Sequence, residues 1–272
     1  MKIRQICAVY FSPTGGTEQA ARLIAGELAQ LLRAETRLID FTRPEHRQKE
    51  YRFTPDELVL VCTPVYAGRI PNKLLPDFSA RILGSGHTPA LAVCTFGSRS
   101  VDEALRELVL LLDGNGFQTA GAAAFVCRHA FSDRVGTGRP DDADRLQMRE
   151  FARKAAEKLE RGAPLSPLPI DRSEIGPYYT PLKTDGTPAR FLKAKPLTRG
   201  DICTRCGLCV QACPMHSIDG ATMEAAGLCI KCQACVRRCP VHAKYFADEE
   251  FLSHVAMLEQ TCTGRAEHIL LV

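Results

Sequence analysis

Residues 6–17 read ICAVYFSPTGGT, an apolar run that ends in a loop of hydroxyl-bearing residues and glycines. The run from Ile6 to Phe11 predicts a buried strand. Apolar residues then recur at helical spacing from Ala20 to Leu31, which predicts a helix with Thr17 as its N-cap. A strand that leads through a short loop into a helix is the repeating unit of an α/β fold with a parallel sheet.

The same alternation of strand and helix patterns continues to about residue 161. Further strands are predicted at 36–39, 58–63, 90–96 and 119–127, with helices at 100–114 and 142–161. Residues 1–161 are therefore expected to form one doubly wound α/β domain. Residues 128–143 have no simple place in this pattern and are open to interpretation as a lid or a surface insertion.

The loop at 12–17 combines hydroxyls, flexible backbone and a helix N-terminus, an arrangement that binds phosphate without a basic side chain. A turn or an ordinary N-cap uses the same residues, so the motif alone leaves both readings open. It resembles the phosphate loop of flavodoxins, whose pattern is Ser/Thr-x-Thr-Gly-x-Thr. The resemblance implies a sheet of order 2-1-3-4-5, with ligands bound at the carboxyl ends of the strands.

Two further loops match the flavodoxin arrangement in position, at 63–68 (TPVYAG) and 95–100 (TFGSRS). In that family such loops hold the flavin ring, so the resemblance implies FMN as a cofactor. Packing against a domain interface is the alternative role for the aromatic rings of Tyr66 and Phe96. The expected FMN-binding residues are Ser12, Thr14, Gly15, Gly16, Thr17, Pro64, Val65, Tyr66, Gly68, Thr95, Phe96, Gly97 and Ser98.

Prolines recur through residues 162–200, where helical and strand periodicity stop. This stretch is expected to be a linker, and its apolar residues Ile175, Tyr178, Tyr179 and Phe191 suggest that it packs across the domains. Residues 248–272 are expected to form a C-terminal tail. Cys262 within that tail has no assigned role.

Eight of the 13 cysteines lie between Cys203 and Cys239. They form two copies of C-x2-C-x2-C-x3-C-P, offset by 26 positions, which is the spacing of bacterial two-cluster ferredoxins. In this pattern the fourth cysteine of each copy binds the other cluster. One predicted ligand set is Cys203, Cys206, Cys209 and Cys239, and the other is Cys229, Cys232, Cys235 and Cys213.

Residues 201–247 thus resemble a small α+β ferredoxin domain with two 4Fe–4S clusters. Two structural zinc sites are the alternative, because C-x2-C is also a zinc spacing. Clusters with a purely structural role are a second alternative. Small bacterial ferredoxins are acidic, whereas this segment has an excess of basic residues, including Arg205, Arg237 and Arg238. An acidic redox partner is therefore expected, unless these are only solvated surface charges.

Composition excludes several other classes of protein. The formal net charge is +4 and no run of Lys and Arg forms a basic patch, so nucleic acid is not an expected partner. Apolar runs are too short for an export signal or a membrane span, which predicts a cytoplasmic protein. The remaining cysteines Cys7, Cys62, Cys94 and Cys127 fall on predicted strands and are expected to be buried, not reactive.

The whole chain resembles flavodoxin–ferredoxin fusion proteins. The resemblance implies an electron-transfer protein of anaerobic metabolism that relays electrons between two 4Fe–4S clusters, FMN and an external redox protein. The alternative is a flavin-dependent reductase of a quinone or nitro compound fed through the clusters, and a redox sensor is a third class. No catalytic residue is predicted. No strand is followed by G-x-G-x-x-G, so the sequence does not support direct use of NAD(P)H, although flavodoxin-like reductases can accept nicotinamide without that motif.

Overall fold

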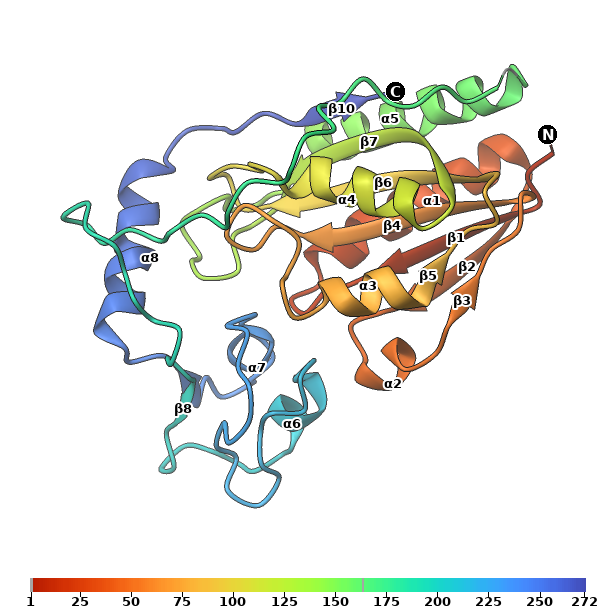
Figure 1. Cartoon of the computed structure of the whole chain (residues 1–272). Helices are drawn as coiled ribbons and strands as arrows, with labels where there is room; N and C mark the ends of the chain where they lie inside the picture. The colour runs from red at the N-terminus through yellow and green to blue at the C-terminus, as the bar shows by residue number, and fades with distance from the viewer. Residues whose placement is uncertain (1, 163) are drawn as a thin grey trace.

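The computed structural model describes residues 2–162 and 164–272. Its centre is a six-stranded sheet of order β10-β7-β6-β4-β1-β2 (Figure 1). Five strands run parallel and one, β10, is antiparallel. The parallel strands are β1 (Gln5–Tyr10), β2 (Glu35–Asp40), β4 (Glu57–Pro64), β6 (Thr88–Phe96) and β7 (Phe117–Val126). The central strands are apolar along their length because both faces of the sheet are covered.

Helices cover both faces of this sheet. On one face α1 (Gly16–Leu32) and α5 (Asp142–Glu160) pack through a core cluster that includes Ile24 and Phe151. On the other face α3 (Leu75–Arg81) and α4 (Ala104–Gly114) contribute to a second cluster. Smaller elements complete this part of the chain, namely α2 (Pro44–Arg47) and the two-stranded pair β3 (Tyr51–Arg52) and β5 (Ile82–Leu83). The result is the expected doubly wound, flavodoxin-like α/β domain.

The start of α1 differs from the sequence prediction. Gly15, with φ of 93°, occupies the N-cap position, so the predicted N-cap role of Thr17 is wrong. The hydroxyl of Thr17 instead makes a buried hydrogen bond with the hydroxyl of Thr95, 2.6 Å away at the end of β6. The helix begins two residues earlier than an N-cap at Thr17 requires, because glycine tolerates the left-handed backbone at its entry.

Residues 248–272 are ordered into α8 (Glu249–Thr261) and β10 (Ile269–Leu271). Strand β10 pairs with β7 and so returns the chain to the edge of the sheet (Figure 1). Beside it, the His268 ring accepts a hydrogen bond from the Val126 N–H at 3.1 Å and contacts buried Asp144 at 3.0 Å. The end of the chain is thereby anchored on the α/β domain.

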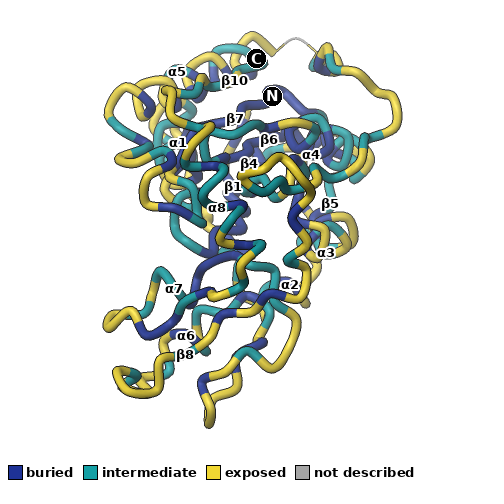
Figure 2. Tube along the Cα trace, turned by 90° about the vertical axis from the view of Figure 1, so that its left-hand side faces the viewer, coloured by how far each residue is buried: buried dark blue, intermediate teal, exposed yellow. Residues whose placement is uncertain are grey.

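The cysteine-rich segment, residues 201–247, lies below the carboxyl ends of the parallel strands (Figure 1). It contains two short helices, α6 (Leu208–Ala212) and α7 (Ala234–Arg237). An antiparallel pair, β8 (Leu197–Thr198) and β9 (Lys244–Tyr245), joins its ends. Figure 2 shows buried residues concentrated in the α/β domain, while the outer loops around α6 and β8 are largely exposed.

The sequence repeat is also a repeat of backbone conformation. Three pairs of residues 26 positions apart have positive φ, and they are Arg205 and Lys231, Gly207 and Gln233, and His216 and His242. Helices α6 and α7 begin directly after the second of these pairs. Each copy of the cysteine motif therefore turns its loop in the same way.

Residues 164–200 pack against the α/β domain and against α8. The Tyr178 hydroxyl donates to the Ile70 carbonyl at 2.9 Å, and the Tyr179 N–H donates to the Ala67 carbonyl at 2.8 Å. The Phe191 ring packs edge-on against Phe251 of α8, with ring centroids 5.4 Å apart. This stretch thus borders the loop that follows β4.

The four cysteines expected on strands are buried, which confirms that prediction, and burial raises the pKa of the Cys7 and Cys127 thiols to about 12. Among the described residues, none of the helices is both long enough and apolar enough to cross a membrane.

Candidate cofactor sites

The eight cysteines of the repeat line two separate hollows. The first, here called the proximal hollow, is lined by Cys213, Cys229, Cys232 and Cys235 among other residues. The second, the distal hollow, is lined by Cys203, Cys206, Cys209 and Cys239 among others. Each hollow is therefore lined by the first three cysteines of one motif copy and by the fourth cysteine of the other copy.

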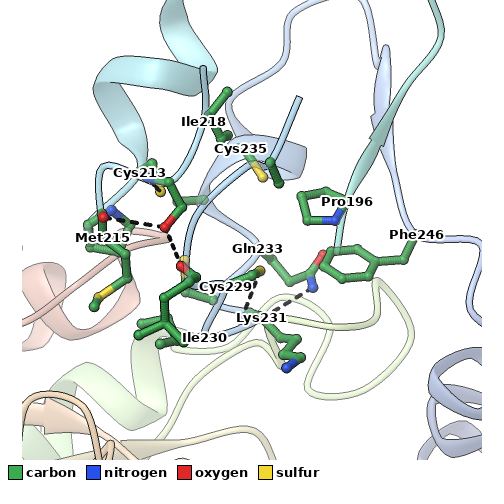
Figure 3. A pocket seen from close by; sticks show the side chains of 16 residues that line it. Pro196, Cys213, Met215, Ile218, Cys229, Ile230, Lys231, Gln233, Cys235 and Phe246 are labelled. Atoms are coloured by element: carbon green, nitrogen blue, oxygen red, sulfur yellow. Dashed lines mark hydrogen bonds between the residues drawn. The ribbon is translucent and has the colours of Figure 1, made fainter. Parts of the chain in front are cut away.

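Figure 3 shows the proximal hollow, where Cys213, Cys229 and Cys235 approach from two separate segments of chain. Apolar side chains such as Ile218 and Phe246 complete its wall. Burial raises the pKa of the Cys235 thiol to about 12 and raises that of Cys232 further. These thiols need a bound metal to become thiolates at neutral pH.

Backbone N–H groups donate to sulfur at equivalent places in the two copies. The Ser217 N–H donates to Cys213 Sγ at 3.3 Å, and the Ala243 N–H donates to Cys239 Sγ at 3.1 Å. Cys213 and Cys239 are the fourth cysteines of their motifs, and each lines the hollow that contains the first three cysteines of the other motif copy. Such hydrogen bonds stabilise negative charge on sulfur and raise the reduction potential of a cluster bound there.

The chemistry of the donors bears on what each hollow could hold. Four cysteine thiols from two segments of the chain line each hollow. Four thiols are the ligand set of a 4Fe–4S cube, so the donors fit one cube in each hollow.

The loop at 12–17 lies at the N-terminus of α1. The Ser12 hydroxyl accepts a hydrogen bond from the Glu18 N–H at 2.9 Å, which curls the loop over the helix. Within residues 2–162 and 164–272, the N–H groups of Thr14, Gly15, Gly16 and Thr17 have no acceptor. Free N–H groups at the positive end of a 17-residue helix fit a phosphate group.

The other two predicted loops lie beside this one. The Val65 N–H donates to the Thr95 carbonyl at 2.8 Å, which joins the loop after β4 to the loop after β6. Each of these two loops contains a glycine at a position where a side chain would clash with a neighbouring residue. A Cβ at Gly68 would lie 2.2 Å from Asp102 Oδ2, and one at Gly97 would lie 2.3 Å from the His129 ring. The structure therefore brings all three predicted FMN loops to one edge of the sheet.

The loop that follows β4, which carries Tyr66, also lies against the cysteine-rich segment. Burial raises the pKa of the Tyr66 phenol well above its usual range, and the neighbouring Cys232 and Cys229 thiols raise it further. Met215 and Ile230, which line the proximal hollow, pack against the apolar core of the α/β domain. The proximal hollow thus lies next to Tyr66, at the same edge of the sheet as the predicted flavin loops.

Two arginines connect the parts of the molecule, and no sequence motif pointed to a role for Arg47. Its guanidinium is buried, donates to the Pro214 carbonyl at 2.5 Å and pairs with Asp77 at 3.0 Å. Arg237 donates to the Ala130 carbonyl at 3.1 Å and also pairs with Asp133. Residues 128–143, which had no predicted place, therefore include a contact surface for α7.

Lys244 is one of the basic residues of the cysteine-rich segment, for which solvated surface charge was one expectation, but its side chain is not at the surface. It is buried beside the distal hollow, and its ammonium donates to the Thr198 hydroxyl at 2.7 Å and to the Met223 carbonyl. Burial raises the pKa of the Cys209 and Cys235 thiols, and the Lys244 charge acts in the opposite direction on both. A buried cation thus lies near one cysteine of each set. Nothing in the sequence pattern around Lys244 predicts that its side chain is buried near the cysteines.

A family model described as a 4Fe-4S binding domain matches residues 200–219. This match covers the first cysteine motif, and the second motif lies outside it. The chain thus joins a doubly wound α/β domain to a segment similar to 4Fe-4S binding domains. This similarity supports an electron-transfer or redox role, because 4Fe–4S clusters change oxidation state by single electrons.

Several solved structures are similar to the chain at low sequence identity. A flavodoxin from the domain Archaea is 15% identical, with 57% of this chain and 99% of that one covered and a TM-score of 0.40. A Streptococcus pneumoniae flavodoxin is 16% identical, with 58% and 99% covered and a TM-score of 0.38. An NADH:FMN oxidoreductase in its apo form is 18% identical, with 60% and 92% covered and a TM-score of 0.41. No curated protein matches the chain significantly.

Proposed function

We propose that this protein relays electrons between FMN and an external redox protein through two 4Fe–4S clusters. The division of eight cysteines between two hollows carries the proposal. Each hollow has the four thiols that one cube needs, and the crossed membership of Cys213 and Cys239 is the ligand pattern of two-cluster ferredoxins.

FMN is proposed at the carboxyl ends of β1, β4 and β6. Thr14, Gly15, Gly16 and Thr17 would hold its phosphate through their N–H groups and hydroxyls. Tyr66 and Phe96 are on the two loops proposed to hold the ring. When bound, FMN supplies the ability to exchange either one or two electrons with its partners. The chain's own contribution is to hold the three loops together and to place Tyr66 beside Cys232 and Cys229.

The position of the hollows sets the proposed order of the relay. The proximal hollow contacts the α/β domain through Met215 and Ile230 and lies beside Tyr66. The distal hollow is lined only by residues of the 198–244 stretch, and Cys206 in its wall is exposed. The proximal cluster is therefore proposed to exchange electrons with FMN, and the distal cluster with the external protein.

Anaerobic purification followed by iron, sulfide and flavin analysis tests this function. Two cubes and one FMN predict on the order of eight irons, eight sulfides and one flavin per chain. Absorption should show flavin bands above the broad absorption of the cubes. Stoichiometric zinc with negligible iron and sulfide would overturn the cluster assignment. Eight irons without flavin after reconstitution with FMN would leave the ferredoxin half correct and refute the relay to FMN.

A further inference from the structure

The internal repeat places equivalent residues in different surroundings in the two motif copies. Around the proximal hollow, Met215 packs against the α/β core and Ala234 is fully buried. The equivalent residues 26 positions away are Val241 and Leu208, which line the distal hollow and are 36% and 42% exposed. A surface covered inside the molecule in one copy is thus open in the other.

Pro214, whose carbonyl accepts the hydrogen bond from Arg47, shows the same difference between the two motif copies. Pro214 is buried and its carbonyl accepts a hydrogen bond from Arg47 of the α/β domain. Its equivalent, Pro240, is exposed. We call the surface formed by Cys206, Leu208, Pro240 and Val241 the distal face. Exposed apolar side chains next to a cofactor site mark a surface that binds a partner.

The charge around the distal face indicates the kind of partner. Arg205 and Arg238 are exposed and directly precede Cys206 and Cys239 in the sequence, whereas the exposed acids of residues 201–247, Asp201, Asp219 and Glu224, are not adjacent to a cysteine. Positive charge next to an apolar centre favours an acidic partner and raises its association rate. A second copy of this chain has a net charge of +4, so it lacks the overall complementarity that an acidic protein offers.

We propose that the distal face is the docking surface for a small acidic one-electron carrier protein. This inference rests on the proposed relay and adds where the external partner binds. In the exchange, the reduced carrier would lose one electron and a cluster held by Cys203, Cys206, Cys209 and Cys239 would gain it, with no bond made or broken. The α/β domain on the proximal side and the carrier on the distal side then occupy equivalent surfaces of the two motif copies.

The test uses the full chain loaded with its cofactors and an acidic bacterial two-cluster ferredoxin, reduced beforehand, as the probe. Stopped-flow spectroscopy measures the second-order rate of cluster reduction at several salt concentrations. Val241→Glu and Leu208→Glu add a charge that repels the probe on the distal face, and Arg205→Glu reverses one. Leu192→Glu is the matched control, because Leu192 is 91% exposed and outside both hollows.

We expect the Val241→Glu, Leu208→Glu and Arg205→Glu variants to lose about tenfold in rate at low salt and to approach the unchanged protein at high salt. Leu192→Glu should retain the full rate, and dithionite should reduce all variants equally. Unchanged rates in the face variants, or an equal loss in Leu192→Glu, would overturn the docking surface. A protein that binds no clusters would contain little iron. The iron analysis therefore distinguishes failure of the proposed function from failure of the docking surface. If a glutamate variant does not load clusters, Arg205→Gln on the exposed rim gives the same comparison.

Discussion

The hydroxyl oxygens of Thr17 and Thr95 lie 2.6 Å apart in the interior of the protein, although 78 residues separate them in the sequence. Thr17 belongs to the first turn of α1, and Thr95 is the second-to-last residue of strand β6. This hydrogen bond joins the proposed phosphate loop to the proposed ring loop. A change on either side is therefore expected to reach the bound flavin.

Replacing Thr17 or Thr14 by alanine should weaken FMN without removing the clusters. A lost neutral hydrogen bond costs about 1 kcal/mol, which corresponds to roughly a fivefold rise in Kd. Flavin fluorescence titration of Thr17→Ala, Thr14→Ala and the exposed control Thr54→Ala measures this difference. Unchanged FMN affinity in both loop variants would exclude this loop as the phosphate site.

Arg47→Met should destabilise the contact between the α/β domain and the cysteine-rich segment. The substitution leaves the Pro214 carbonyl and the Asp77 carboxylate without their buried partner, at a cost of roughly 2–3 kcal/mol. Electron exchange between cluster and flavin should also slow, because the proximal hollow is no longer held against the Tyr66 loop. Anaerobic denaturation and stopped-flow spectroscopy measure the two effects, with the exposed Arg161→Met as control. Wild-type values in both would show that Arg47 has no role in holding this contact.

Lys244→Gln should lower the reduction potential of the cluster in the distal hollow. A buried cation favours the more negative, reduced state of a cluster, so its removal has the opposite effect. A shift of about tenfold in the reduced fraction at a fixed solution potential corresponds to about 59 mV for one electron. Redox titration followed by EPR should find this shift in Lys244→Gln and a smaller one in Lys244→Arg. Equal potentials in wild type and Lys244→Gln would refute the effect.

The stability of the protein should fall as pH drops from about 6.5 toward 4 in part because of His129. Burial lowers the pKa of His129 to about 4, with further effects from His254, Arg99 and Arg237. The unfolded chain then binds a proton that the folded chain excludes, so stability is full above the unfolded pKa and decreases below it. Between pH 7 and 5, the loss in the free energy of unfolding should be smaller in His129→Asn than in wild type by on the order of 1 kcal/mol. Denaturant unfolding at both pH values, compared with exposed His87→Asn, measures it. An identical pH slope in His129→Asn and wild type would contradict the assignment.

The sequence was sufficient to predict the α/β domain, and the two cysteine sets stay a prediction that the lining of the two hollows supports. Apolar runs and helical periodicity are local signals, and a spacing such as C-x2-C-x2-C-x3-C constrains which thiols one loop can present. The three loops after β1, β4 and β6 were predictable because parallel strands end at one edge of a sheet.

Features that depend on contacts between distant residues were not predictable. The N-cap role of Thr17 was wrong because its hydroxyl pairs with Thr95, on another strand. The pairing of β10 with β7 and the hydrogen bond from Arg47 to Pro214 join residues more than 140 positions apart. No periodicity in a single sequence encodes such a contact.

The most direct test of the relay compares two electron sources for the flavin by stopped-flow spectroscopy. Reduced acidic ferredoxin should reduce the flavin of the intact protein, and the rate should fall in Cys206→Ser and in Cys232→Ser, which damage the distal and the proximal cluster. NADH and NADPH should reduce the flavin slowly in all three proteins, while dithionite reduces it in each. Rapid reduction by NADH or NADPH in the intact protein and in both cysteine variants would contradict the relay and identify the protein as a flavin reductase.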